Sequence, residues 1–175
     1  MQDYSDWFEW LSPEAPASDA DISYLQNNTL MALTRSEINQ LNQVHWDLIK
    51  DSQQSFDASN YRLPIGKFPP SYICFLKWSN GGSFQNGAMQ FEPFFTPQEI
   101  REYLLSYEFP AYLPDAVPIG LDGGGIFYVL DMRKPPIQAE YPIFMVGAGA
   151  LFWEEALWVA DSFEILLKRQ DNPLD

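Results

Sequence analysis

The segment PIGLDGGGIFYVLD, from Pro118 to Asp131, is the part of this sequence that most resembles a phosphate-binding loop. Three glycines follow Asp122, but no Lys-Ser/Thr pair comes after them and they fit no G-x-G-x-x-G register. A phosphate loop leads into a helix whose N-terminal amides bind the anion, whereas the run that follows here alternates like a strand. We therefore predict a turn between two strands, in which glycines adopt positive φ and Asp122 bonds nearby amides.

Carboxylates in the second half of the chain could bind a metal ion only if the fold gathered several of their oxygens. Asp122 has Asp115 and Asp131 as its nearest acidic neighbours, and these lie at the far ends of the predicted strand pair. Glu154 and Glu155 are adjacent, so on a strand they would point to opposite faces, and in a loop they would be solvated. We expect no metal site and no cofactor.

The sequence contains one histidine, His45, and one cysteine, Cys74, as candidates for catalysis. His45 lies inside a predicted helix and on no catalytic motif, which is typical of a surface or boundary histidine. Cys74 lies among apolar residues, which favours a buried, inert thiol, and a single cysteine excludes an intrachain disulfide. Because no G-x-S-x-G, H-E-x-x-H or Cys-His signature occurs, we expect no enzyme. A hydrolase built on paired carboxylates stays open, since the fold decides that pairing.

Tryptophans near the ends of predicted elements indicate a different kind of site. Trp78, Trp153 and Trp158 lie near predicted loops or strand ends, and tryptophan commonly anchors protein interfaces. Tryptophan is also highly buried on average, so the same residues are candidates for the core. The sequence leaves both interpretations open.

Capping boxes predict three helices that would position these residues. The boxes lie at 34–37, 96–99 and 161–164, and each places a side-chain acceptor before an apolar run with helical spacing. A fourth helix is expected in 69–82, opened by two prolines and closed by Asn-Gly-Gly. Its buried face would carry Tyr72, Phe75, Leu76 and Ser79.

Short apolar or aromatic runs bounded by Gly, Pro and Asn predict the strands 89–94, 117–121, 126–131, 141–146 and 157–160. Helices flank this run of strands and do not alternate strictly with them. The pattern therefore predicts an α+β fold, a single domain with a central, mainly antiparallel, twisted sheet flanked by helices. Residues 1–32 are expected to form an N-terminal extension that packs on the domain of residues 33–175.

Composition limits the classes of function. Of the 175 residues, 46% are hydrophobic, which is enough for a single core. The net charge of -14 would repel a phosphate backbone, so no direct nucleic-acid binding is expected, whereas it would attract a basic protein. The same charge also has a plain interpretation as a source of solubility. Without a signal sequence or a long apolar segment, we expect a cytoplasmic protein with no membrane contact.

Four segments in a fixed order carry a family resemblance. They are LTRSEI, PPSYICFLKWSNGG, PIGLDGGGIFYVLD and ADSFEILL. This combination resembles the SUKH superfamily, which includes fungal cell-wall-synthesis regulators and many bacterial immunity proteins. The matching elements run over residues 33–167, so that 33–175 would be a SUKH-like domain.

The resemblance implies a non-enzymatic domain that binds another protein. Bacterial members are commonly encoded beside toxins, many of them nucleases, and neutralise them by direct association, whereas fungal members act as scaffolds in cell-wall signalling. The long disordered flanks of the fungal proteins have no counterpart here, which favours an immunity protein and leaves the regulatory scaffold as the alternative. The segment 51–64 is longer and more polar than usual in the family and is expected to be an insertion that shapes a partner surface.

The expected partner is a basic toxin domain, with nucleases among the candidates, and the expected oligomeric state is a monomer or a weak dimer. Charge matching would accelerate association and a few aromatic anchors would supply affinity. Loop and edge positions are the expected contact residues, namely Trp78, Asn80, Asp122, Trp153, Glu154 and Glu155.

Overall fold

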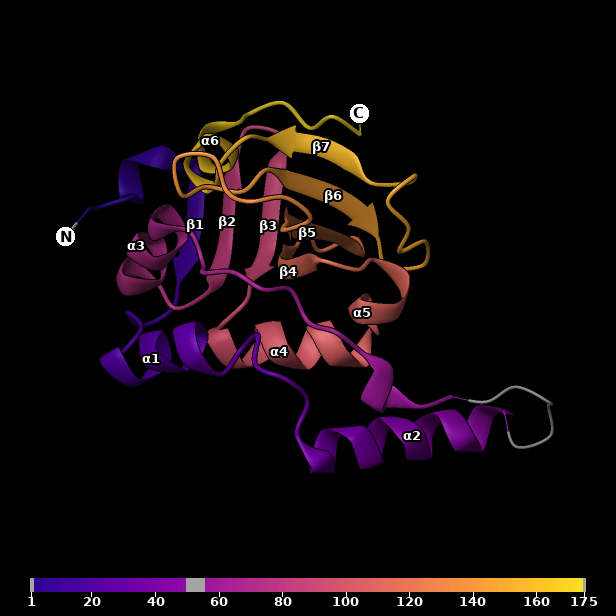
Figure 1. Cartoon of the computed structure of the whole chain (residues 1–175). Helices are drawn as coiled ribbons and strands as arrows, with labels where there is room; N and C mark the ends of the chain where they lie inside the picture. Colours follow the sequence, from indigo (N-terminus) through magenta and orange to yellow (C-terminus); the bar gives the residue numbers. More distant parts are fainter. Residues whose placement is uncertain (1, 50–55, 175) are drawn as a thin grey trace.

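The computed structural model describes residues 2–49 and 56–174 and contains one antiparallel sheet (Figure 1). Seven strands follow one another in the order β1-β2-β3-β4-β5-β6-β7, so that each pairs with its neighbours in the sequence. The strands are β1 (Trp10–Pro13), β2 (Gly82–Asn86), β3 (Met89–Phe94), β4 (Ala116–Leu121), β5 (Ile126–Asp131), β6 (Ile143–Gly147) and β7 (Leu157–Ala160). The predicted α+β fold with an antiparallel sheet is confirmed.

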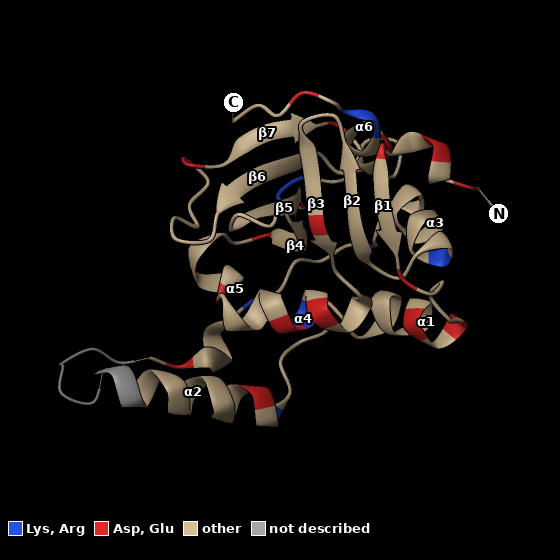
Figure 2. Ribbon diagram, turned by 180° about the vertical axis from the view of Figure 1, so that it is seen from behind, with Lys and Arg blue, Asp and Glu red and all other residues tan. Residues whose placement is uncertain are grey.

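Six α-helices surround this sheet in the described part of the chain. They are α1 (Asp19–Asn27), α2 (Arg35–Ile49), α3 (Pro70–Trp78), α4 (Pro97–Ser106), α5 (Phe109–Tyr112) and α6 (Phe163–Lys168), with short 3-10 turns η1 (Ser5–Trp7) and η2 (Ala58–Asn60). Helices α3 and α6 cover one face of the sheet, α1 and α4 lie side by side across one end of β1 to β3, and α2 lies outside α4 (Figure 1). The opposite face of β1 to β3 carries no helix (Figure 2).

The capping chemistry fixes where the helices begin. Thr96 and Glu99 form the predicted box of α4, because the Thr96 N–H donates to Glu99 Oε2 at 2.8 Å and the Glu99 N–H donates to Thr96 Oγ1 at 3.3 Å. The third box was expected to begin at Asp161, and this is wrong by one residue. The cap of α6 is Ser162, whose Oγ accepts the Ile165 N–H at 3.3 Å.

The face of α3 that packs on the sheet is the predicted one. Tyr72, Phe75 and Leu76 are fully buried there, and Ser79 is buried at the C-cap. The prediction of a buried Cys74 is wrong, because the thiol is exposed. Cys74 follows Tyr72 by two positions, about 200° around the helix, and so lies on the opposite face.

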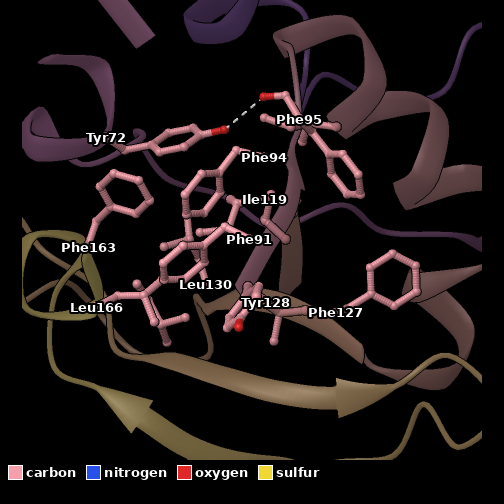
Figure 3. Packing of buried hydrophobic residues seen from close by; sticks show 14 of the residues in the cluster. Tyr72, Phe91, Phe94, Phe95, Ile119, Phe127, Tyr128, Leu130, Phe163 and Leu166 are labelled. Carbon is pink, nitrogen blue, oxygen red and sulfur yellow. Dashed lines mark hydrogen bonds between the residues drawn. The ribbon is translucent and has the colours of Figure 1, made fainter. Parts of the chain in front are cut away.

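Aromatic rings fill the core between α3, α6 and the sheet (Figure 3). Phe75 and Phe94 meet edge to face with ring centroids 5.2 Å apart, and Phe94 contacts Phe163 in the same way at 5.4 Å. The buried Tyr72 hydroxyl donates to the Phe95 carbonyl at 3.2 Å, so its polar atom has a partner. Burial raises the pKa of Tyr72 and keeps the hydroxyl neutral.

Residues 2–32 contribute directly to the sheet and to the helical layer. Strand β1 pairs with β2, and α1 packs against α4. The segment also crosses to α3, because the Ala17 N–H donates to the Leu76 carbonyl at 2.9 Å. Of the segment 51–64, residues 51–55 lie outside the described residues, and the remainder contains η2.

Candidate interaction surface

Asp122 lies at the start of the hairpin that joins β4 to β5. Its Oδ1 accepts the Gly124 N–H at 2.7 Å and the Ile126 N–H at 2.9 Å, while Gly123 and Gly125 have φ values of 82° and 95°. The predicted turn is confirmed. These two amides already bind the chain's own carboxylate, so they are not free to cradle a phosphate.

Trp153, Glu154 and Glu155 lie in the turn between β6 and β7. The Trp153 Nε1–H donates to the Pro114 carbonyl at 3.0 Å, and the Arg133 guanidinium lies 3.6 Å from the centre of a Trp153 ring. The indole is therefore held by contacts within the chain. The two carboxylates beside it are exposed, which leaves them accessible to a partner.

Trp78 and Asn80 lie at the C-terminal end of α3, close to the N-terminal segment. The half-buried Trp78 ring packs on Tyr4 and Phe8, with centroids 5.5 and 6.4 Å away. The Asn80 N–H donates to the Ala15 carbonyl at 3.1 Å. Its Oδ1 is buried and has no hydrogen-bond partner among the described residues.

These six expected contact residues fall into three separate regions of the sheet. Trp78 and Asn80 border β1, which is one edge, whereas Trp153 to Glu155 precede β7, which is the other edge. Asp122 lies between them at the β4–β5 hairpin. A partner of ordinary interface size would contact only some of these positions.

Helix α2 is attached to the rest of the domain by polar contacts that the sequence analysis did not identify. At its N-terminal end, Glu37 pairs with Arg101 of α4, and the guanidinium also donates to main-chain carbonyls in residues 28–32. Hydrogen bonds from Arg101 lower the pKa of Glu37 to about 2. Arg101 is only 6% exposed, so this pair is a structural bond and not a free charge.

Further along α2, His45 makes the second attachment. Its Nε2 lies 2.7 Å from Glu108 Oε1, and the ring stacks on Phe56 with centroids 3.4 Å apart. Glu108 has φ 54° and also accepts the Tyr61 hydroxyl at 3.0 Å. The expected boundary position of His45 is confirmed, and its role is to hold α2 in place.

Charge is distributed unequally over the surface. Acidic residues appear on α1, α4, β3 and the start of α2 (Figure 2). Four of the described lysine and arginine side chains are engaged with carboxylates, namely Arg101, Arg133, Lys168 and Arg169. The exposed acidic residues therefore dominate the field that a partner meets.

Metal-binding and membrane-spanning features concern the residues that the structure describes. Among them, no three His, Cys, Asp or Glu side chains are grouped so that they could hold a metal ion. None of the described helices combines the length and the apolar character that crossing a membrane requires.

Comparison with known protein families gives a match. No curated protein is significantly similar to the chain. The family described as SMI1 / KNR4 (SUKH-1) matches residues 47–169, which is more than half of the chain and contains β2 to β7. The family comprises protein-interaction and immunity-type domains and is generally non-enzymatic. The match contains three of the four segments and begins after LTRSEI, at 33–38. The resemblance to the SUKH superfamily is thus confirmed, and the chain belongs to the SMI1/KNR4 (SUKH-1) family.

Proposed function

We propose that this chain is an immunity protein that neutralises a toxin domain by binding directly to it. The observation that carries the proposal is the SUKH-1 match over residues 47–169, in a family of interaction and immunity domains. The chain would act without catalysis, in the cytoplasm, as a monomer or a weak dimer. Its inhibitory effect would come from covering the toxin.

Charge supports a basic toxin domain as the partner. With a net charge of -14, the protein attracts basic surfaces over several ångströms and repels phosphate backbones. Nuclease domains are partners of this kind, because proteins that bind a phosphate backbone do so with lysine and arginine. An acidic inhibitor would occupy the surface that such an enzyme uses for nucleic acid.

We further propose that loop and edge residues contact the toxin. Glu154 and Glu155 offer exposed carboxylates in one turn. Trp153 lies in the same turn, whereas Asp122, Trp78 and Asn80 would add contacts if the toxin extends to the separate regions in which they lie. A stable complex buries about 800 Å² of each partner, so residues around the Glu154–Glu155 turn would contribute as well.

Co-expression with the toxin encoded by the adjacent gene tests the function. The chain should restore growth of cells that make this toxin, and calorimetry should show a one-to-one complex of the purified proteins. A toxin domain of another class serves as the control and should not bind. Absence of both rescue and binding would rule out the proposed function, and an isolated locus with an endogenous partner would indicate a regulatory scaffold.

A further inference from the structure

Helices α2 and α4 enclose a groove with a volume of about 540 Å³. In both ribbon views α2 lies alongside α4 on the outer side of the domain (Figures 1 and 2). From α2 the groove receives Glu37, Leu41 and Val44, which are spaced so that they share one helical face. From α4 it receives Arg101, Glu102 and Leu105, so the groove belongs to none of the turns described above.

Helix α2 is attached to the rest of the domain by polar contacts, one of which is the hydrogen bond from the Ala58 N–H to Asn42 Oδ1 at 2.8 Å. The Glu37–Arg101 pair and the His45–Glu108 contact attach the helix at two points eight residues apart. Between these two points α2 contributes Gln40, Leu41 and Val44 to the groove, with Leu41 half-buried and Val44 51% exposed. Exposed apolar side chains on a helix that lies at the outside of a domain are typical of a docking surface.

The charges around the groove define the chemistry of its occupant. Glu102 on α4 is exposed and has no ion-pair or hydrogen-bond partner among the described residues. Glu37 and Glu108 add two more carboxylates to the lining. The one cation in the lining, among the residues that the structure describes, is Arg101, which is buried and bound to Glu37 and to main-chain carbonyls. The lining of the groove therefore combines the apolar side chains of Leu41, Val44 and Leu105 with amide and hydroxyl groups, and it carries three carboxylates against one guanidinium.

We propose that this groove receives a basic amphipathic helix of the toxin domain. Apolar residues of that helix would cover Leu41 and Val44, while a lysine or arginine would pair with Glu102. The inference rests on the proposed function and adds to it the surface and the element that are recognised. It also accounts for the incomplete burial of Leu41 and Val44, which line the groove on the α2 side.

Calorimetry with the toxin domain of the adjacent gene tests this docking site at about 0.3 M salt, where screening acts beyond about 6 Å. The groove variants are Val44→Lys and Glu102→Lys, both at exposed positions. Matched controls are Trp46→Lys, an exposed apolar residue of α2 outside the groove lining, and Glu9→Lys, an exposed acidic residue before β1. The dissociation constant should rise at least about tenfold for the groove variants and less than about twofold for the controls.

Amide hydrogen exchange of the wild-type complex gives a second, mutation-free readout. The toxin domain should slow exchange in α2 and α4 relative to the free protein. If the wild type binds, but groove and control variants bind alike and neither helix is protected, the docking site is wrong and the proposed function stands. If the wild type neither binds the toxin nor rescues growth, the proposed function fails and the docking site with it.

Discussion

Arg101 and Glu37 form a two-point ion pair between α4 and the first turn of α2. The guanidinium donates from Nε to Oε1 at 2.7 Å and from Nη2 to Oε2 at 2.8 Å. Glu37 Oε2 also accepts the Thr34 N–H at 2.7 Å, so one carboxylate both caps α2 and binds α4. Three main-chain carbonyls that precede α2 bind Nη1 at 2.9 to 3.0 Å. The loop from α1 to α2 is thereby ordered around one buried cation.

Replacing this cation should weaken the fold. Arg101→Met replaces the guanidinium with an unbranched apolar side chain and leaves Glu37 and several carbonyls without a donor. The free energy of unfolding should therefore fall by about 3 kcal/mol. Urea unfolding followed by circular dichroism measures the loss. Arg35→Met, at an exposed position of the same region, is the control and should change stability by less than about 0.5 kcal/mol. Equal effects of the two variants would contradict the structural role of Arg101.

The same pair should make stability depend on pH in acid. Hydrogen bonds from Arg101 lower the pKa of Glu37 from 4.5 to about 2, so between these values the unfolded chain binds more protons than the folded one. The contribution of Glu37 is therefore complete above its unfolded pKa and is lost as the pH falls toward 2. The free energy of unfolding should decrease more from pH 6 to pH 3 in the wild type than in Glu37→Gln. Parallel curves for the two proteins would contradict this assignment.

The β4–β5 hairpin should depend on the Asp122 side chain. Asp122→Ala removes the acceptor of the Gly124 and Ile126 amides, which should cost about 1 kcal/mol of stability. Asp122→Asn keeps an oxygen acceptor at the same place and should lose less. Thermal unfolding of the three proteins at pH 7 gives the comparison, and an Asn variant as unstable as the Ala variant would indicate that the negative charge itself is needed.

Cys74 should react with a thiol reagent in the folded protein. The thiol is exposed on the outer face of α3, so Ellman's reagent should titrate one equivalent without denaturant. Cys74→Ser should show no reaction and should fold as the wild type does. Labelling that begins only after unfolding would contradict the outward orientation of Cys74 on α3.

The elements that could be predicted from the sequence are those with local signals. The boxes at Thr34 and Thr96 announce α2 and α4, and the apolar runs of β3, β5 and β7 have their observed bounds. Strands β1 and β2 lack such signals. In β2 two of the three buried positions are Gly82 and Asn86, which do not form an apolar run. Strand β1 is a largely exposed edge strand that ends in proline, so it has no apolar alternation either. Their pairing depends on contacts between residues more than sixty positions apart.

The groove between α2 and α4 could not be predicted from the sequence either, because it also depends on contacts between residues far apart in the chain. Arg101 occupies the apolar stripe of α4 beside Ile100 and Leu104, which is an available signal for a buried cation. Its partner Glu37, however, already has a local role in a capping box, and nothing in the sequence joins positions 37 and 101. Trp78 and Glu154 were chosen as candidates by residue type and expected loop position. Neither criterion predicts that the fold places them near different edges of the sheet.

Electrostatic steering gives a prediction about the rate of association with the toxin domain. If Glu154 and Glu155 lie at the contact, changing both to Lys should slow association about tenfold at low salt and flatten its salt dependence. Changing Asp6 and Glu9 to Lys alters the net charge equally, at exposed positions near the other edge of the sheet. Because the Debye length is about 8 Å at 0.15 M salt, the distant pair should have the smaller effect there. Stopped-flow measurement of the association rate over a range of salt concentrations compares the two double variants with the wild type. Equal slowing by both pairs would show that only net charge matters, and a rate independent of salt would remove steering from the mechanism.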